Sequence, residues 1–167
     1  RADFYTVAVR TGGPGAAGVS LLLIERERPG FTRAELKKMG WWCSDTASLH
    51  FDQVRVPAAN LIGEENAGFR AIMRNFNSER LGMAAGAVGF AQTCLDDALD
   101  WARSRTTFGQ PLIGHQAIRH KLVDMQARVH AARALLYDTA WKLTQAPREP
   151  AHIAQLAILK NVATDAM

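Results

Sequence analysis

The order of hydrophobic and polar residues divides the chain into a β-rich first part and a helical second part. Apolar residues alternate with small or polar ones over residues 5–9, which is the period of a half-buried strand. A continuous apolar run over residues 19–24 predicts a buried strand, so these two segments should form a hairpin. Residues 31–38 fit one helical turn. Residues 47–56 fit a strand, in which a one-residue slip of the apolar phase predicts a β-bulge.

The hydrophobic period changes to 3.6 residues after Ala67, as in an amphipathic helix. The apolar stripe breaks near Asn77 and Ser78, either of which can cap a second helix. A third helix follows Pro111, and a fourth begins near Pro150. The apolar positions of the four helices are Phe69, Ile72, Met73 and Phe76; Leu81, Ala84, Val88, Ala91, Leu95, Ala98 and Ala102; Ile118, Leu122, Met125, Val129, Ala132 and Leu136; and Ile153, Leu156, Leu159 and Val162.

These elements predict an α+β fold. An antiparallel, β-barrel-like segment is followed by an antiparallel up-and-down helix bundle, which is an incomplete four-helix domain. The alternating steps of four and three residues in the third helix are typical of a bundle seam. The expected domains are residues 1–65 and residues 66–167.

Composition narrows the function only slightly. The 167 residues carry a net charge of +4, but the basic residues are scattered, so a solvated surface is favoured over a nucleic-acid patch. No run of about 18 apolar residues is present, so no membrane span is expected. Cys43 and Cys94 lie far apart and fit free thiols in a reducing compartment. The five histidines show no metal-ligand spacing, and no metal is expected.

Residues 13–18 match the Gly-x-Gly-x-x-Gly pattern of dinucleotide-binding loops. That loop works because a helix N-terminus follows it and directs free N–H groups at a pyrophosphate. Here the third glycine leads into the apolar run that predicts a strand. The sequence therefore argues against a dinucleotide site at this loop.

Glu79 is a candidate catalytic carboxylate. It falls in the first turn of the predicted second helix, where the macrodipole favours a negative charge, although a plain first-turn glutamate is the more ordinary interpretation. Small residues follow between Gly82 and Gly89. They leave room either for a flat ligand or for a closely packed neighbouring helix, and both interpretations are open from the sequence alone.

Arg105 and Phe108 frame a glycine-containing turn between two helices. A guanidinium suits a diphosphate and a phenyl ring suits an aromatic ligand, but a C-cap charge and a core anchor are the more ordinary roles. For the adjacent Trp41 and Trp42, core packing with one interfacial ring is favoured over ligand stacking.

Four blocks in this order and spacing resemble the flavin-dependent acyl-CoA dehydrogenases, and within them the long-chain- and isovaleryl-like branch. The resemblance extends over almost the whole chain. The blocks are Lys38-Met39-Gly40-Trp41 with Ser44-Asp45-Thr46-Ala47; Phe51-Asp52-Gln53-Val54-Arg55-Val56-Pro57 with Asn60-Leu61-Ile62-Gly63-Glu64; Glu79-Arg80 with the small residues up to Gly89; and Arg105-Thr106-Thr107-Phe108-Gly109-Gln110 through His115-Gln116.

The resemblance implies the end of a middle β domain that runs into a C-terminal helical domain, with FAD bound between them and across a subunit interface. It implies oxidation of an acyl-CoA thioester to the trans-2-enoyl-CoA, in which a carboxylate takes the proton next to the thioester carbonyl. Electron-transfer flavoprotein is the implied electron acceptor. The implied assembly is a homodimer or homotetramer, in the cytoplasm or the mitochondrial matrix.

Residue by residue, the resemblance implies that Glu79 is the catalytic base. Asn77, Ser78 and Arg80 match the segment that lines the acyl-CoA site. Arg105, Phe108 and Gln116 match positions that contact FAD, the first two on a neighbouring subunit. Most of the family places the base farther downstream, and the branch that this chain resembles places it where Glu79 stands.

The family's N-terminal helical domain and its last helices are not in this sequence, so we expect a fragment that neither binds FAD well nor turns over alone. Two alternatives for the whole protein are an acyl-CoA oxidase that uses oxygen and a non-catalytic nucleic-acid-binding homologue on the same fold. No nucleic-acid partner is expected.

Overall fold

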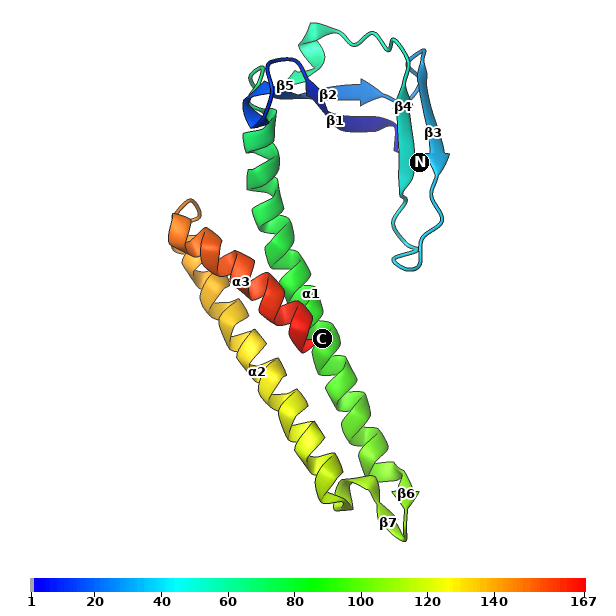
Figure 1. The fold of residues 1–167 in the computed structure, drawn as a ribbon, viewed down its shortest axis with the longest axis vertical. Coiled ribbons are helices and arrows are strands. Elements are labelled where there is room, and N and C mark those ends of the chain that lie inside the picture. The colour runs from blue at the N-terminus through cyan, green and yellow to red at the C-terminus, as the bar shows by residue number, and fades with distance from the viewer. Residues whose placement is uncertain (1) are drawn as a thin grey trace. The chain divides into compact units, whose positions relative to one another are not determined.

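The computed structural model describes residues 2–167, which form two compact units, one ending at Arg74 and the other beginning at Asn75. The first unit is built mainly of short strands and the second mainly of helices (Figure 1). In chain order the elements are β1 (Phe4–Arg10), the 3-10 helix η1 (Ala16–Gly18), β2 (Val19–Glu25), β3 (Phe31–Glu35), β4 (Ala47–Phe51), η2 (Ala58–Asn60), β5 (Leu61–Ile62), α1 (Gly68–Ser104), β6 (Thr106–Thr107), β7 (Gln110–Pro111), η3 (Leu112–Gly114), α2 (Gln116–Gln145) and α3 (Pro150–Ala166).

The predicted hairpin of the first unit is confirmed. β1 and β2 pair antiparallel from Phe4 opposite Glu25 to Arg10 opposite Val19, and β5 pairs with the other edge of β2. Half-buried and exposed residues alternate strictly along β1, because one face of the strand lies against the core. The glycine-rich segment between the strands leads through η1 directly into β2. No helix N-terminus follows the third glycine, as the sequence indicated.

Residues 31–35 form a strand, and the prediction of a helical turn there is wrong. β3 pairs antiparallel with β4, from Phe31 opposite Phe51 to Glu35 opposite Ala47. The Phe31 ring stacks on Phe51 and meets the edge of Tyr5, with ring centroids 5.0 Å apart in both pairs. Such aromatic cross-strand contacts stabilise a sheet by more than the weak local helix preference.

The predicted β-bulge is instead the end of a strand. β4 stops at Phe51, and the chain leaves the sheet through Gln53, which has a φ of +49°. The Asp52 N–H donates to the Gly30 carbonyl at 2.9 Å. The one-residue slip in hydrophobic phase therefore reflects a turn. A residue with left-handed backbone, such as Gln53, can shift the phase as readily as a bulge can.

The α+β class is confirmed. The strands form three small antiparallel sheets, of three, two and two strands. Within residues 2–167 these sheets do not close into a barrel. The β segment shares only the antiparallel strand pairing with a β-barrel. The domain boundary between residues 65 and 66 stays a prediction. In this same part of the chain no helix combines the length and the hydropathy that crossing a bilayer requires.

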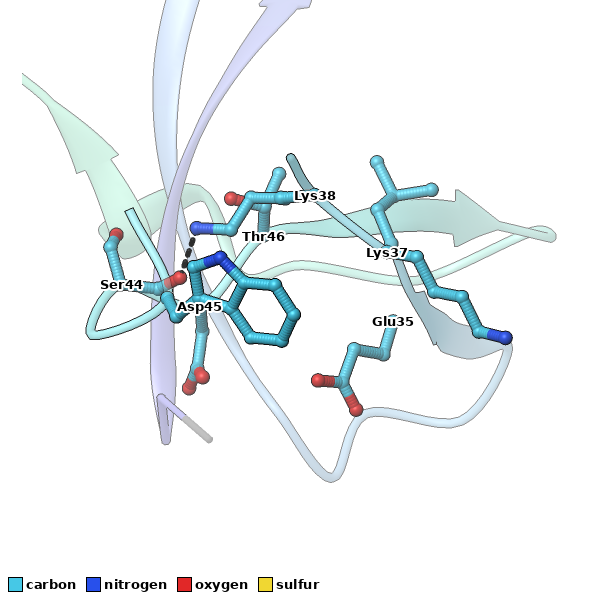
Figure 2. Close-up of a pocket in the computed structure, with 8 residues that line it drawn as sticks. Glu35, Lys37, Lys38, Ser44, Asp45 and Thr46 are labelled. Atoms are coloured by element: carbon cyan, nitrogen blue, oxygen red, sulfur yellow. Dashed lines mark hydrogen bonds between the residues drawn. The ribbon is translucent and has the colours of Figure 1, made fainter. Parts of the chain in front are cut away.

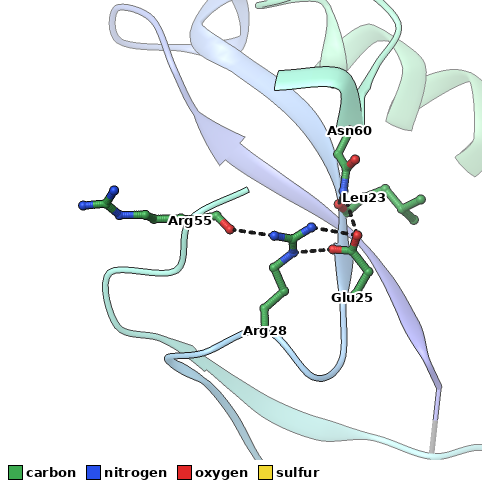
Figure 3. Close-up of polar contacts among 5 residues, drawn as sticks. All are labelled: Leu23, Glu25, Arg28, Arg55 and Asn60. Atoms are coloured by element: carbon green, nitrogen blue, oxygen red, sulfur yellow. Dashed lines mark hydrogen bonds and ion pairs between the residues drawn. The ribbon is translucent and has the colours of Figure 1, made fainter. Parts of the chain in front are cut away.

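A polar cluster ties the end of β2 to the loop that leads toward α1 (Figure 3). The Arg28 guanidinium donates to both carboxylate oxygens of Glu25, at 2.5 and 2.8 Å, and to the Arg55 carbonyl at 3.2 Å. The Asn60 amide donates to the Leu23 carbonyl at 2.9 Å and to Glu25 at 3.3 Å. The hydrogen bond from Arg28 is the largest of the effects that lower the pKa of Glu25 from its usual 4.5 to about 2.

This pKa predicts acid sensitivity. A carboxyl whose pKa is lower in the folded state stabilises the fold above the unfolded pKa and loses that contribution as it is protonated. We therefore expect the thermal midpoint of the full-length protein to fall between about pH 4.5 and pH 2. The dependence should be shallower in Glu25→Gln, measured by thermal unfolding at a series of pH values. Equal slopes in the two proteins would contradict a role for this cluster.

α1 is one helix from Gly68 to Ser104, and the predicted break at Asn77 and Ser78 is wrong. Asn and Ser favour helix caps because their side chains compete for backbone hydrogen bonds. In α1 the side chains of Asn75 and Asn77 instead bond to other side chains of the same helix. The backbone ladder therefore continues through them.

In the second unit α2 runs antiparallel to both α1 and α3, so α1 and α3 run in the same general direction (Figure 1). The third and fourth predicted helices are α2 and α3, and Pro150 is the first residue of α3, as expected. Alanines on α1 and α2 allow close approach of α3, whose leucines fill the centre. The buried cluster comprises Ala84, Ala87 and Val88 of α1, Ala132 of α2, and Leu156, Leu159 and Ala163 of α3.

Leu159 is completely buried in this cluster. Leu159→Ala should therefore destabilise the protein by about 2–5 kcal/mol, since it removes apolar contacts and leaves a cavity. Ile158 is its exposed neighbour, and Ile158→Ala is the matched control, expected to cost under about 0.5 kcal/mol. Denaturant unfolding of the full-length variants measures both. Equal losses would mean that another segment or chain covers the exposed face of α3.

Candidate active site

Glu79 lies about three turns into α1 and is exposed. The macrodipole effect fades within the first turn of a helix, so the expected support from a helix N-terminus is absent. Asn75 supplies a contact instead, because its Nδ2 donates to Glu79 Oε1 at 2.5 Å. Arg80 is held separately, through a 3.0 Å hydrogen bond from its Nη1 to Asn77 Oδ1. Ser78, between them, is exposed.

On the face of α1 that carries Glu79, the residues that follow are glycines, which have no side chain. Gly82, Gly86 and Gly89 follow it at three, seven and ten residues, which places them on the same side of the helix. All three are exposed, and a Cβ added to any of them would find no described atom within 4 Å apart from the adjacent residues and the backbone of α1 itself. A glycine inside a helix is about 1 kcal/mol less favourable than alanine, so this stripe lowers helix stability.

The other small residues of this segment have a different role. Ala84 and Ala87 are buried and face the other two helices. Helix packing is thus confirmed for the alanines, while room for a ligand beside the glycines stays a prediction. The alanines allow helix packing, and the glycines leave an open surface beside the carboxylate.

A tight hairpin carries Arg105 and Phe108. Thr107 pairs with Gln110, so the loop consists of Phe108 and Gly109 alone, with φ of +50° and +80°. Positive φ at both loop residues is the requirement of a type I′ turn, and asparagine or glycine usually fills these positions. A bulky residue with positive φ is strained, and such strain gathers at functional sites. The Phe108 side chain is 98% exposed, so a core anchor is excluded within this chain.

His115 fastens the hairpin to the start of α2. Gln110 Nε2 lies 3.1 Å from His115 Nδ1, and His115 Nε2 lies 3.3 Å from the Thr107 carbonyl. A hydrogen on Nε2 satisfies both contacts. The Phe108 ring meets the imidazole edge-on, with centroids 6.2 Å apart. No sequence pattern indicated this role of His115 beyond its place before a helix.

Gln116 is the first residue of α2 and is exposed, as is Arg105 at the other end of the hairpin. The hairpin therefore presents an exposed guanidinium, an exposed phenyl ring and an exposed amide near one end of the helical unit. The described residues contain no group of three or more side chains that could hold a metal ion.

Residues 66–167 match the family described as acyl-CoA dehydrogenase, C-terminal domain. This match extends over more than half of the sequence. The chain belongs to the acyl-CoA dehydrogenase family. These enzymes are flavin-dependent, and the α+β fold expected from the resemblance is the fold observed.

Individual relatives agree with the family match. An acyl-CoA dehydrogenase of Bacillus subtilis is 43% identical over 141 residues, which are 83% of this chain and 37% of the relative. The solved structure of a putative acyl-CoA dehydrogenase from Mycobacterium smegmatis has a TM-score of 0.92 at 44% identity, over 99% of this chain and 43% of that one. A chain in the solved structure of the electron transferring flavoprotein of Acidaminococcus fermentans has a TM-score of 0.88 at 34% identity, again over 99% and 43%. This chain thus spans about two fifths of the length of its relatives.

In this acyl-CoA dehydrogenase chain, the two groups of predicted site residues lie far apart. Twenty-five residues of continuous helix separate Glu79 from Ser104, next to Arg105. At 1.5 Å per residue the distance along α1 is about 38 Å. The structure therefore brings Asn77, Ser78, Glu79 and Arg80 together on one helix, and Arg105, Phe108 and Gln116 together at the hairpin, but not the two groups with each other.

The strand unit of the dehydrogenase chain has a separate pocket of about 520 Å³ beside the loop after β3 (Figure 2). The Lys38 ammonium turns back to the carbonyls of Trp41, at 2.7 Å, and Ser44, so it stabilises the loop. Trp41 and Trp42 are 70% and 83% exposed, so the predicted packing of one of these rings in the core is wrong. The lining residues are Glu35, Leu36, Lys37, Lys38, Trp42, Ser44, Asp45 and Thr46.

Proposed function

We propose that the full-length protein dehydrogenates an acyl-CoA thioester to the trans-2-enoyl-CoA, with FAD as hydride acceptor. The observation that carries the proposal is the Glu79 carboxylate on the open glycine face of α1, in a chain of the acyl-CoA dehydrogenase family. The chain is about two fifths of the length of its relatives. The activity is therefore proposed for the whole protein.

Glu79 acts as the base that takes the proton from the carbon next to the thioester carbonyl. Its Oε1 accepts from Asn75, which leaves Oε2 for the proton. The acyl chain lies along the glycine stripe, where no side chain of the described residues intervenes. Asn77, Ser78 and Arg80 line the acyl-CoA site on the same helix.

The hairpin residues fit FAD. The exposed Phe108 ring can contact an aromatic ring, the exposed Arg105 guanidinium can pair with the diphosphate, and the Gln116 amide adds a hydrogen-bonding group. FAD, when bound, accepts the hydride from the carbon next to the one that loses its proton. The strained φ of Phe108 supports this assignment, because the turn would be more stable with another residue.

The site is shared between two copies of the chain. Because about 38 Å of helix separates Glu79 from Arg105, the hairpin of one copy completes the site that contains Glu79 of another. A homodimer or homotetramer follows from this arrangement. Electron-transfer flavoprotein is the proposed acceptor, supported by the similar chain in the Acidaminococcus fermentans structure. The cellular location stays a prediction.

Anaerobic titration of the full-length flavoprotein with short, branched and long acyl-CoA thioesters tests the proposal. Loss of the yellow flavin absorbance with one class of thioester, together with formation of the enoyl product, is the expected result. Rapid oxygen consumption in air after reduction would instead indicate an oxidase. If no thioester reduces the flavin and the protein binds DNA with a steep salt dependence, the dehydrogenase proposal is overturned in favour of a nucleic-acid-binding homologue.

A further inference from the structure

Three residues that disfavour helix interiors, Asn75, Asn77 and Ser78, lie inside α1 directly before Glu79 and Arg80. Two of the three side chains form hydrogen bonds with Glu79 or Arg80: Asn75 donates to Glu79, and Asn77 accepts from Arg80. Positions that go against local structural preference gather at functional sites. A functional role therefore accounts for amides at these positions better than helix formation does.

We propose that Asn75 is a positioning residue for the Glu79 carboxylate, an inference that rests on the proposed role of Glu79 as base. The two residues are one helical turn apart on the same face, and Asn75 Nδ2 lies 2.5 Å from Glu79 Oε1. Glu79 is exposed, and so are Asn75 and Met83, the residues one helical turn before and after it. The amide is the contact that restricts its side-chain rotamers, which an exposed glutamate otherwise samples freely.

Arg80 does not supply this restraint. Adjacent residues of a helix do not face each other, and the Arg80 guanidinium is engaged with Asn77 Oδ1 at 3.0 Å. The Asn75 bond is made to Oε1, so Oε2 is the oxygen that this amide does not engage. Asn75 thus fixes both where the carboxylate lies and which oxygen receives the proton.

A purely structural role makes a different prediction. Exposed side-chain pairs four residues apart stabilise a helix slightly wherever they occur. Under that role, loss of Asn75 would lower the thermal midpoint and leave the chemical step unchanged. Under the positioning role, the chemical step slows while acyl-CoA binding and the thermal midpoint stay nearly constant.

The test measures flavin reduction by stopped flow in the full-length flavoprotein under anaerobic conditions, together with the Kd of the product enoyl-CoA by calorimetry. Asn75→Ala should slow reduction by about 10- to 100-fold, since a misplacement of about 1 Å can cost that much. Asn75→Asp keeps the size, removes the donor and adds a like charge, so it should be at least as slow. Asn75→Gln keeps an amide donor on the same face and should recover most of the rate. The Kd should change less than about two-fold in all three.

Gln126→Ala is the matched control, because Gln126 also places an amide beside a side chain one turn later, His130 of α2. Its reduction rate should equal that of the wild type. A wild-type rate in Asn75→Ala, with Glu79→Gln inactive, overturns the positioning role alone. If Glu79→Gln reduces the flavin as fast as the wild type, or the wild type is not reduced by any acyl-CoA, the assignment of Glu79 as base fails and the role of Asn75 fails with it.

Discussion

Glu79→Gln in the full-length protein is expected to slow flavin reduction by acyl-CoA by about 10²–10⁴-fold, the usual contribution of a general base. Glutamine keeps the length of the side chain, and its carbonyl oxygen can still accept the bond from Asn75 that Glu79 Oε1 accepts. It cannot take a proton from carbon. The variant should therefore bind acyl-CoA with little change in Kd while the reduction step is lost.

The measurement is rapid-mixing absorbance of the flavin with the best acyl-CoA substrate of the wild type. Glu149→Gln, at the cap of α3, is the matched control for loss of one carboxylate from the helical unit and should leave the rate unchanged. A wild-type rate in Glu79→Gln would place the base in a part of the protein outside this chain. Glu79 would then be an exposed helix residue with no catalytic role.

Co-expression of two inactive variants is expected to restore activity. One variant carries Glu79→Gln, and the other carries Arg105→Ala with Phe108→Ala. Glu79 and the hairpin lie about 38 Å apart on one chain, and in the proposed shared site the base comes from one copy and the hairpin from another. A mixed dimer then has one site with both defects and one site with neither.

Each mixed dimer should therefore give about half of the wild-type activity per subunit, since it has one intact site of two. The measurement is dehydrogenase activity per subunit after purification through two different tags. Each variant alone, carried through the same purification, is the control and should be nearly inactive. Absence of activity in verified mixed dimers would contradict a site shared between copies.

The period of the hydrophobic residues predicted most of the helices and strands, because it records which face of each element is buried. The alternation in β1 and the apolar seam of α2 depend on which face meets the core, and that pattern is local in the sequence. β3 could not be predicted in the same way. Its strand conformation depends on Phe31 contacting Phe51 and Tyr5, and contacts between distant residues leave no local periodic signal.

The false helix break shows a second limit. Asn77 and Ser78 are residue types that commonly cap helices, and sequence rules predict caps where such residues interrupt an apolar stripe. The rules do not include side chains that bond to each other across one helical turn, as Asn75 and Glu79 do. A helix break at the predicted caps would have separated Asn75 from Glu79, so the prediction could not include the hydrogen bond between them.

The candidate site residues themselves came from the resemblance, and the structure adds where they lie. The exposure of Phe108 and its positive φ could not be predicted from the sequence, because a phenylalanine before glycine is usually buried or extended. From the sequence, the small residues after Glu79 could either face an open surface or pack against another helix. Only the positions of α2 and α3 show which side of α1 is open.

The Phe108 turn has a consequence for engineering. Asparagine or glycine at this position would relieve backbone strain of about 1–3 kcal/mol, so libraries screened only for heat resistance should be enriched in those substitutions. The selected proteins would survive heating and lose the aromatic ring offered to the cofactor. A screen that scores retained yellow colour alongside melting temperature would keep the phenylalanine, and the difference between the two screens would measure how much the ring contributes to flavin retention.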